Sequence, residues 1–226
     1  MIACVVSSYG GQLWCDLGAG AAHAAFADGF PLVFHHHDPS FDRPLGLVRN
    51  DAIAKLPPDV EWVVLCDADD TLAPGYHAAM SATLDEDNDA PALLVPRVQY
   101  DQAEPKFWPR QDPVDGNWMV IGTAFRRDVF DKVGGFRDWP LYEDWDLFAR
   151  MQMWGCVPVE VPDAVYRATV NPGSRNRAPR VSTRRYWHQA IGHSLWPDDY
   201  EALTDQDHAR QRIRELRRID KGRQTR

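Results

Sequence analysis

Cysteine is scarce in this 226-residue chain, and its four cysteines lack any metal-binding spacing. Cys4 and Cys66 stand inside apolar runs, so we expect reduced core thiols rather than a zinc site or a disulfide framework. No stretch approaches the ~18 apolar residues that cross a membrane. The first apolar run begins at Ile2 with no signal peptide before it. These absences predict a cytoplasmic chain with no integral membrane segment.

Positive charge is also scarce over most of the chain. Residues 175–226 contain 13 Lys and Arg against 7 Asp and Glu, whereas the rest of the chain has a net charge of −14. Because nucleic-acid binding depends on neutralising phosphates, the acidic body is a poor platform for it. The basic segment either contacts an anionic partner or forms an ordinary solvated helix. We expect one domain over residues 1–175 and a basic, mainly helical extension over residues 176–226.

A Gly-x-Gly-x-x-Gly pattern is missing after the first apolar run, which leaves a dinucleotide site unsupported. The chain has instead an acidic stretch, Glu61-Trp-Val-Val-Leu-Cys-Asp-Ala-Asp-Asp-Thr71. Its apolar part predicts a buried strand, and the carboxylates must emerge at the end of that strand because desolvating them is costly. Asp67 and Asp69 flank a single residue, and such hard oxygen ligands suit Mn²⁺ or Mg²⁺. The alternative is an acidic turn that only ends a strand.

Predicted strands and helices alternate along the chain. Strands are expected at 2–6, 30–34, 62–66, 92–98 and 157–161, and helices at 12–27, 46–56, 74–84 and 126–133. This order predicts an α/β fold with a mostly parallel sheet flanked by helices. Ligands of such sheets bind at the carboxyl ends of the strands. We therefore expect Asp38, Arg49, Asp67 and Asp69 on one rim, unless Arg49 simply pairs with a nearby acid.

A second acidic cluster lies in Tyr142-Glu-Asp-Trp-Asp-Leu147, at the start of a predicted amphipathic helix that ends at Gly155. Negative charge in the first turn of a helix is favourable, so Glu143 and Asp144 can be plain capping residues. They can equally provide a general base held by a rigid helix start. The polar segment 100–117 before them is either an excursion over the site or a surface loop.

Taken together, these elements resemble the glycosyltransferase family 2 group of the GT-A fold. The resemblance covers residues 2–175, and its specificity comes from a DXD-type motif, a Gly-Gly-Phe helix end and a Glu-Asp pair in that order. The matching segments are Val5-Val-Ser-Ser-Tyr9, Asp38, Arg49-Asn50, Leu65-Cys-Asp-Ala-Asp-Asp70, Phe125–Phe136 and Tyr142–Leu147.

The resemblance implies a Rossmann-like GT-A sheet with a C-terminal helical extension. It also implies a metal-dependent, inverting transfer of a sugar from a nucleotide-sugar donor, expected to be a UDP-sugar. The acceptor hydroxyl would belong to a glycan, a protein or a lipid-linked glycan. By this resemblance, Asp69 assisted by Asp67 holds Mn²⁺ or Mg²⁺ against the donor diphosphate.

The resemblance assigns further roles residue by residue. Ser7, Tyr9 and Asp38 match positions that cradle the base and ribose, and Arg49 matches a position that stabilises developing negative charge. Asp144, with Glu143 beside it, matches the catalytic base. One departure stands out: the family's histidine after the last strand is absent here, near Thr169.

Two other functions fit parts of the sequence. Val64–Thr71 matches the hhhDxDx[TV] pattern of haloacid-dehalogenase-type phosphatases, with Asp67 as nucleophile and Asp69 as acid/base. That motif normally opens its chain, however, and here two predicted strands precede it. The nine tryptophans suggest instead a non-catalytic carbohydrate-binding protein, although such a protein has no need of two acidic clusters.

Overall fold

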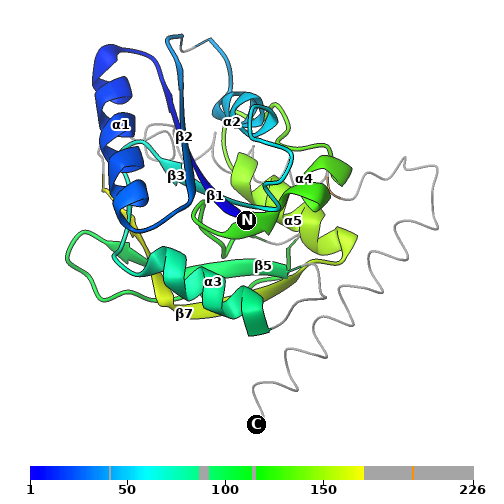
Figure 1. The fold of residues 1–226 in the computed structure, drawn as a ribbon. Coiled ribbons are helices and arrows are strands. Elements are labelled where there is room, and N and C mark those ends of the chain that lie inside the picture. Colours follow the sequence, from blue (N-terminus) through cyan, green and yellow to red (C-terminus); the bar gives the residue numbers. More distant parts are fainter. Residues whose placement is uncertain (41, 87–91, 114–115, 171–194, 196–226) are drawn as a thin grey trace, which may run out of the picture.

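The computed structural model describes residues 1–40, 42–86, 92–113, 116–170 and 195. The expected extension over residues 176–226 lies outside these ranges apart from Leu195, so its structure stays a prediction. The elements, most of them labelled in Figure 1, are β1 (Ile2–Tyr9), α1 (Gln12–Ala27), β2 (Leu32–Asp38), α2 (Leu45–Ala54), β3 (Trp62–Asp67), β4 (Thr71–Leu72), α3 (Tyr76–Glu86), β5 (Ala92–Tyr100), β6 (Ala124–Arg126), α4 (Arg127–Lys132), α5 (Glu143–Trp154) and β7 (Val157–Ala168).

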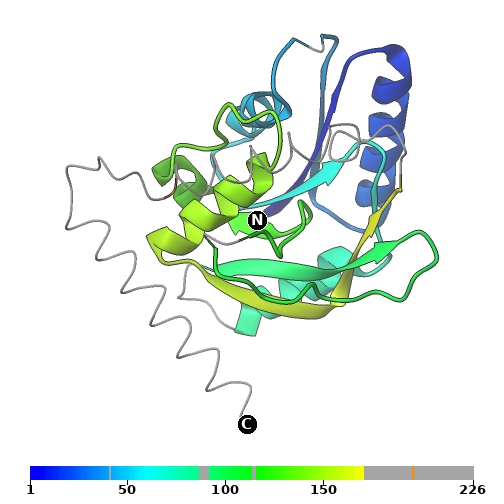
Figure 2. The ribbon, with the colours of Figure 1, turned by 180° about the vertical axis from the view of Figure 1, so that it is seen from behind.

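The strands form a seven-stranded sheet in the order β2-β1-β3-β6-β5-β7-β4. β1 pairs in parallel with β2 and β3, and β5 pairs in parallel with β7. β6 runs antiparallel to both β3 and β5, and β4 runs antiparallel to β7. The prediction of an α/β fold with a mostly parallel sheet is confirmed. Figure 2 shows that the sheet curls, so that β5 and β7 cross beneath the end formed by β1 and β3.

Helices cover both faces of the sheet. α1 and α2 lie on opposite sides of β1 and β2, while α2, α4 and α5 lie together on one side in both ribbon views (Figures 1 and 2). α1 packs so closely on β2 that a Cβ added at Gly18 would lie 2.4 Å from His35 Nε2. Coverage of both faces explains why β1 and β3 are near-continuous apolar runs rather than alternating ones.

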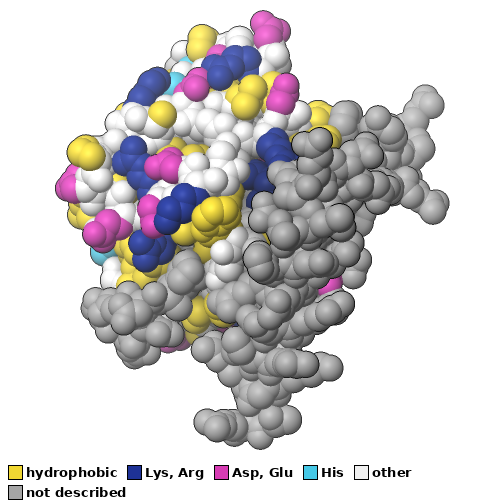
Figure 3. Space-filling view, turned by 90° about the vertical axis from the view of Figure 1, so that its right-hand side faces the viewer, with side chains coloured by type: hydrophobic (Ala, Val, Ile, Leu, Met, Phe, Trp, Pro, Cys, Tyr) yellow, Lys and Arg dark blue, Asp and Glu magenta, His cyan; other side chains and the backbone are white. Residues whose placement is uncertain are grey.

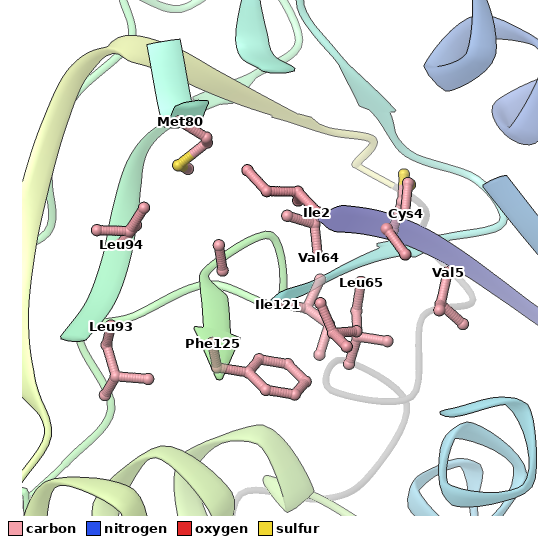
Figure 4. Close-up of a cluster of buried hydrophobic side chains, with 14 of the residues drawn as sticks. Ile2, Cys4, Val5, Val64, Leu65, Met80, Leu93, Leu94, Ile121 and Phe125 are labelled. Carbon is pink, nitrogen blue, oxygen red and sulfur yellow. The ribbon is translucent and has the colours of Figure 1, made fainter. Parts of the chain in front are cut away.

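The hydrophobic core joins the two halves of the sheet (Figure 4). Val64 on β3, Phe125 on β6 and Leu93 on β5 are each fully buried, and Met80 of α3 packs into the same cluster. Cys4 and Cys66 are buried free thiols, and burial raises the pKa of Cys4 to about 12. These thiols are therefore part of the packing and not of any reactive centre.

The second strand differs from its prediction. The apolar run ends at Phe34, but parallel pairing with β1 continues as far as the Tyr9–Asp38 pair. Alternation then places successive histidines on opposite faces: His35 Nε2 and His37 Nδ1 lie 2.9 and 3.0 Å from Ser8 Oγ, whereas His36 faces Lys55. Backbone pairing, rather than hydrophobicity, determines where this strand ends.

The short strands β4 and β6 were not among the expected strands, and β1, β5 and β7 each extend past their expected ends. β4 has only two residues, which pair with Tyr166 and Arg167 of β7. β7 continues to Ala168, past the expected end at Val161. This extension matters because it brings the end of β7 alongside the residues that follow β3.

Charged groups of both signs are interspersed on the surface. The face shown in Figure 3 has Lys and Arg side chains beside Asp and Glu side chains across its described part. The basic segment after residue 175, expected either to contact an anionic partner or to form a solvated helix, lies outside the described ranges apart from Leu195. Within those ranges, no helix has the length and apolar character needed to cross a membrane.

Candidate active site

The residues that follow β3 form a tight acidic turn, Asp67–Asp70, which we call the acid turn. The Asp70 N–H donates to the carbonyl of Asp67 at 3.1 Å, and the chain then enters β4. The buried Tyr166 hydroxyl of β7 donates to Asp70 Oδ2 at 2.6 Å and accepts from the Asp67 N–H at 3.2 Å. The Tyr166 hydroxyl is thus bonded to both the first and the last residue of the acid turn.

Thr169, the residue after β7, also holds the acid turn. Its N–H donates to Asp70 Oδ1 at 2.7 Å, and its hydroxyl donates to the carbonyl of Asp69. Burial and the nearby Asp67 carboxylate raise the pKa of Asp70 to about 7, although the bonds from Tyr166 and Thr169 oppose this. Thr169 thus binds the acid turn through both its backbone and its hydroxyl.

Arg49 connects the acid turn to the second acidic cluster. Its guanidinium, only 2% exposed, donates from Nη1 to Glu143 Oε1 at 2.8 Å and from Nη2 to Asp67 Oδ1. Phe136 covers it, with the ring centroid 5.6 Å from Cζ. Burial lowers the pKa of Arg49, but the carboxylates of Asp67 and Glu143 outweigh burial and raise it overall. Arg49, which was expected on the rim of the sheet, is therefore buried and forms an ion pair with each of these two carboxylates.

Glu143 and Asp144 begin α5, and we call this pair the acidic helix start. Tyr142 before them has a left-handed backbone, with φ of 61°, an uncommon conformation for a residue with a side chain. Glu143 is 3% exposed, whereas Asp144 is half-buried and accepts a hydrogen bond from Asn117 Nδ2 at 3.0 Å. Only Glu143 of the two is bound to Arg49.

The acidic helix start has an altered ionisation equilibrium. Burial and the adjacent Glu143 raise the pKa of Asp144 to about 6, against the opposing effects of Arg49 and of the Trp145 N–H. Asp144 is thus ionised at neutral pH and still basic enough to take a proton, which is the balance that a general base requires.

The carboxyl ends of β1 and β2 lie at the same edge of the sheet. Asp38 Oδ1 accepts from the N–H and the hydroxyl of Ser40, each at 2.9 Å, and these bonds lower the pKa of Asp38. Tyr9 is paired with Asp38 in the β1–β2 register, and Ser7 is paired with Asp67 in the β1–β3 register. Ser7 Oγ is buried and has no hydrogen-bond partner within the described part of the chain.

The structure therefore brings the predicted site residues to one edge of the sheet, as strand polarity implied. It also adds residues that sequence reasoning missed. Tyr166 lies past the expected end of the last strand at Val161, in a stretch predicted to be a loop, whereas the structure places it in β7. Asn117 is one polar residue among many in segment 100–117. The only sequence signal for Asn117 is its place just before the buried Trp118 and Met119.

The acid turn was also considered as a divalent-metal site. Among the residues that the structure describes, no group of three or more His, Cys, Asp or Glu side chains is arranged to hold a metal ion. Asp67 and Asp69 nevertheless supply hard oxygen atoms on either side of Ala68. This donor set fits Mg²⁺ or Mn²⁺ bound through one or two carboxylates and completed by substrate phosphates and water.

Comparisons with known proteins place the fold. No protein-family model matches the chain, and no curated protein matches it. Among solved structures, it is similar to a fragment (residues 1–349) of Staphylococcus aureus TarS in complex with UDP-GlcNAc, with a TM-score of 0.65, 15% identity, and coverage of 92% of this chain and 70% of the fragment.

Other TarS structures agree with this result. The fragment in complex with UDP gives a TM-score of 0.60 at 15% identity, covering 92% of this chain and 69% of the fragment. A longer TarS chain gives a TM-score of 0.59 at 14% identity. That match covers 95% of this chain but only 42% of the TarS chain. The shared feature is the fold: a mixed α/β domain with a mostly parallel, curled sheet.

Proposed function

We propose that this protein is a metal-dependent, inverting glycosyltransferase that moves a sugar from a nucleotide-sugar donor to an acceptor hydroxyl. The observation that carries the proposal is the bridge made by Arg49. It links a carboxylate of the acid turn, suited to a metal and a diphosphate, to the acidic helix start that holds a base. The bridge thus ties the acid turn to Glu143, the residue next to the proposed base Asp144.

The donor is proposed to lie along the carboxyl ends of β1, β2 and β3. Ser7, Tyr9 and Asp38 would contact its base and ribose, and the unpartnered, buried Ser7 Oγ supports a polar ligand there. A UDP-sugar is the proposed donor class, because a protein of this fold is known in complex with UDP-GlcNAc.

Asp69 and Asp67 are proposed to hold Mn²⁺ or Mg²⁺. When bound, the cation neutralises negative charge on the departing diphosphate. The guanidinium of Arg49 holds the Asp67 carboxylate in place. Asp70, engaged by Tyr166 and Thr169, shapes the turn and is not proposed as a ligand.

Asp144 is the proposed base. It takes the proton of the acceptor hydroxyl as that oxygen forms a bond to the anomeric carbon, and the bond from this carbon to the diphosphate oxygen breaks with its electrons. Attack on the face opposite the leaving group inverts the anomeric centre. Glu143, bound to Arg49, contributes by fixing the first turn of α5 rather than by accepting a proton.

The phosphatase alternative is not favoured by any contact. A phosphatase would need Asp67 as a free nucleophile, whereas one oxygen of this partly exposed carboxylate is held by the Arg49 guanidinium. A carbohydrate-binding protein without catalysis would not require the connection between the two acidic clusters.

The proposal can be tested with the purified full-length protein. We expect UDP-sugars with Mn²⁺ or Mg²⁺ to raise its melting temperature, because a ligand that binds only the folded state stabilises it. The shift should shrink with EDTA and in Asp69→Ala, but persist in Asp59→Ala, a matched change at an exposed acid away from the site. With an acceptor present, nucleoside diphosphate should be released and the product should have the inverted anomeric configuration.

Other outcomes identify the alternatives. Phosphate release from a phosphomonoester, with no nucleoside diphosphate formed from any sugar nucleotide, would establish the phosphatase. Binding of glycans that is unaffected by Asp69→Ala and Asp144→Ala would establish a non-catalytic binding protein.

A further inference from the structure

Asn117 contacts the acidic helix start in one defined orientation. Its Nδ2 lies 3.0 Å from Asp144 Oδ2, and its Oδ1 accepts a hydrogen bond from the Met119 N–H at 3.1 Å. A backbone N–H can only donate, so it selects the oxygen end of the amide. The NH₂ end must therefore face the carboxylate, and the contact with Asp144 is a donated hydrogen bond to a charged group.

The segment that contains Asn117 is anchored on both sides. Before it, the carbonyl of Pro113 accepts a hydrogen bond from Trp145 Nε1 at 2.7 Å, so the segment is tied to the same first turn of α5. After it, Trp118 and Met119 are buried, at 3% and 2% exposure. Asn117 is thus held in place by the fold, unlike a side chain on a free surface loop.

The charged surroundings of Asp144 come from several elements. Glu143 is adjacent on α5, Arg49 approaches from α2, Asp67 approaches from β3, and the Trp145 N–H donates to it. Two of these groups are negative and oppose ionisation of Asp144. A neutral donor aimed at one carboxylate oxygen favours the ionised form without adding a charge that would compete for the proton.

We infer that Asn117 is a positioning residue that fixes the rotation of the Asp144 carboxylate, so that a lone pair not used by Asn117 receives the proton of the acceptor hydroxyl. The inference rests on the proposed function, since it concerns the same base. It assigns a catalytic purpose to segment 100–117, which sequence reasoning left as either an excursion over the site or a surface loop.

Two variants separate this role from a merely structural one. Asn117→Ala removes both hydrogen bonds. Asn117→Asp keeps an oxygen for the Met119 N–H but replaces the donor facing Asp144 by an acceptor. Gln111→Ala removes an exposed amide from the same segment and is the matched control. If Asn117 only tethered the segment, Asn117→Ala would leave the Asp144 pKa unchanged. Asn117→Asp also places a second carboxylate beside Asp144, so its pKa shift counts only together with that of Asn117→Ala.

The measurements are kcat and the donor and acceptor KM across pH 5–9, together with the Asp144 pKa from an NMR titration of the carboxyl carbon. We expect kcat to fall about tenfold or more in both Asn117 variants, with donor KM nearly unchanged. The acid limb of the rate profile and the NMR titration should both move to higher pH, while Gln111→Ala matches the wild type.

Several results would overturn the inference. They are an unmoved Asp144 titration in both variants, wild-type kcat in Asn117→Asp, or a moved titration with unchanged turnover. If Asn117→Ala does not fold, Asn117→Ser decides, because it removes the amide donor without adding a charge beside Asp144. If the wild-type protein transfers no sugar at all, the proposed function fails on its own, and the NMR titration still decides whether Asn117 controls the carboxylate.

Discussion

The two acidic clusters at the edge of the sheet are held in different ways. The acid turn is fixed mainly by uncharged donors from the end of β7, the Tyr166 hydroxyl and the Thr169 N–H. The acidic helix start is fixed by a charged donor from α2 and by an amide from the segment before α5. Arg49 is bound to both clusters.

This difference indicates which changes should affect one cluster alone. Hydrogen bonds from neutral donors contribute about 1 kcal/mol each, whereas removing one partner of a buried ion pair costs several times more. Losing a donor from β7 should therefore perturb the acid turn locally. Losing Arg49 should disturb both clusters at once.

The largest expected effect is a loss of turnover at the acidic helix start, because this cluster is proposed to hold the base, whereas the acid turn is proposed to bind the donor. Asp144→Asn should lower kcat by about 10²–10⁴-fold because the amide cannot accept the proton of the acceptor hydroxyl. Donor binding should be kept, because the acid turn is intact. Turnover assays and donor-induced melting shifts measure the two properties separately, and near-normal turnover would show that another group is the base.

The same variant should change the pH dependence of stability. The folded-state pKa of Asp144 is raised from 3.8 to about 6, so the folded protein resists ionisation of this group. The contribution of Asp144 to the free energy of unfolding is therefore most favourable below about pH 4, and it is lost as the pH rises through about 6. Asp144→Asn should therefore be more stable than the wild type at pH 8, by about 1–2 kcal/mol, and close to it at pH 4. Urea unfolding at the two pH values tests the sign.

The next effect concerns the group that joins the clusters. Arg49→Met should lower the free energy of unfolding by about 3–5 kcal/mol, because the buried Glu143 and the partly buried Asp67 would both lose their cation. Glu143→Gln added to Arg49→Met should restore part of the loss, since one buried charge is then removed. Denaturant unfolding of the single and double variants measures this coupling.

Arg43→Met is the matched control for Arg49. Arg43 is 43% exposed and forms an ion pair with Asp51 at 2.7 Å. Exposed pairs contribute about 0–1 kcal/mol, so this variant should unfold almost like the wild type. Equal losses of unfolding free energy in the two arginine variants would mean that the bridge made by Arg49 stabilises the fold no more than an exposed ion pair does.

The sequence predicted the acids of both clusters better than it predicted what holds them. Strand polarity placed Asp38 and Asp67 on one edge, and the Glu143 turn was expected at a helix start. The partners come from far along the chain: Tyr166 is 99 residues from Asp67, and Arg49 is 94 residues from Glu143. Local patterns hold no information about such contacts.

The contacts of Tyr166 depend on pairing that no periodicity indicated. β4 is only two residues long, yet its pairing with β7 sets Tyr166 beside Asp70. Gly122 leaves room for the ring, since an added Cβ would lie 2.2 Å from Tyr166 Cδ2. The sequence shows a glycine and a tyrosine 44 positions apart, and only the folded chain shows that one requires the other.

The smallest effect sharpens the comparison from the side of the acid turn. Tyr166→Phe removes the hydroxyl that bridges Asp67 and Asp70 and should cost about 1–2 kcal/mol of stability. Tyr76→Phe is the matched control: its buried hydroxyl donates to the carbonyl of Gly122 rather than to an acid, so a similar loss of stability is expected. Only Tyr166→Phe should weaken the donor-induced, metal-dependent melting shift, because only there is the acid turn released. Equal weakening in both variants would mean that donor binding follows general stability, and that β7 does not hold the acid turn for its proposed function.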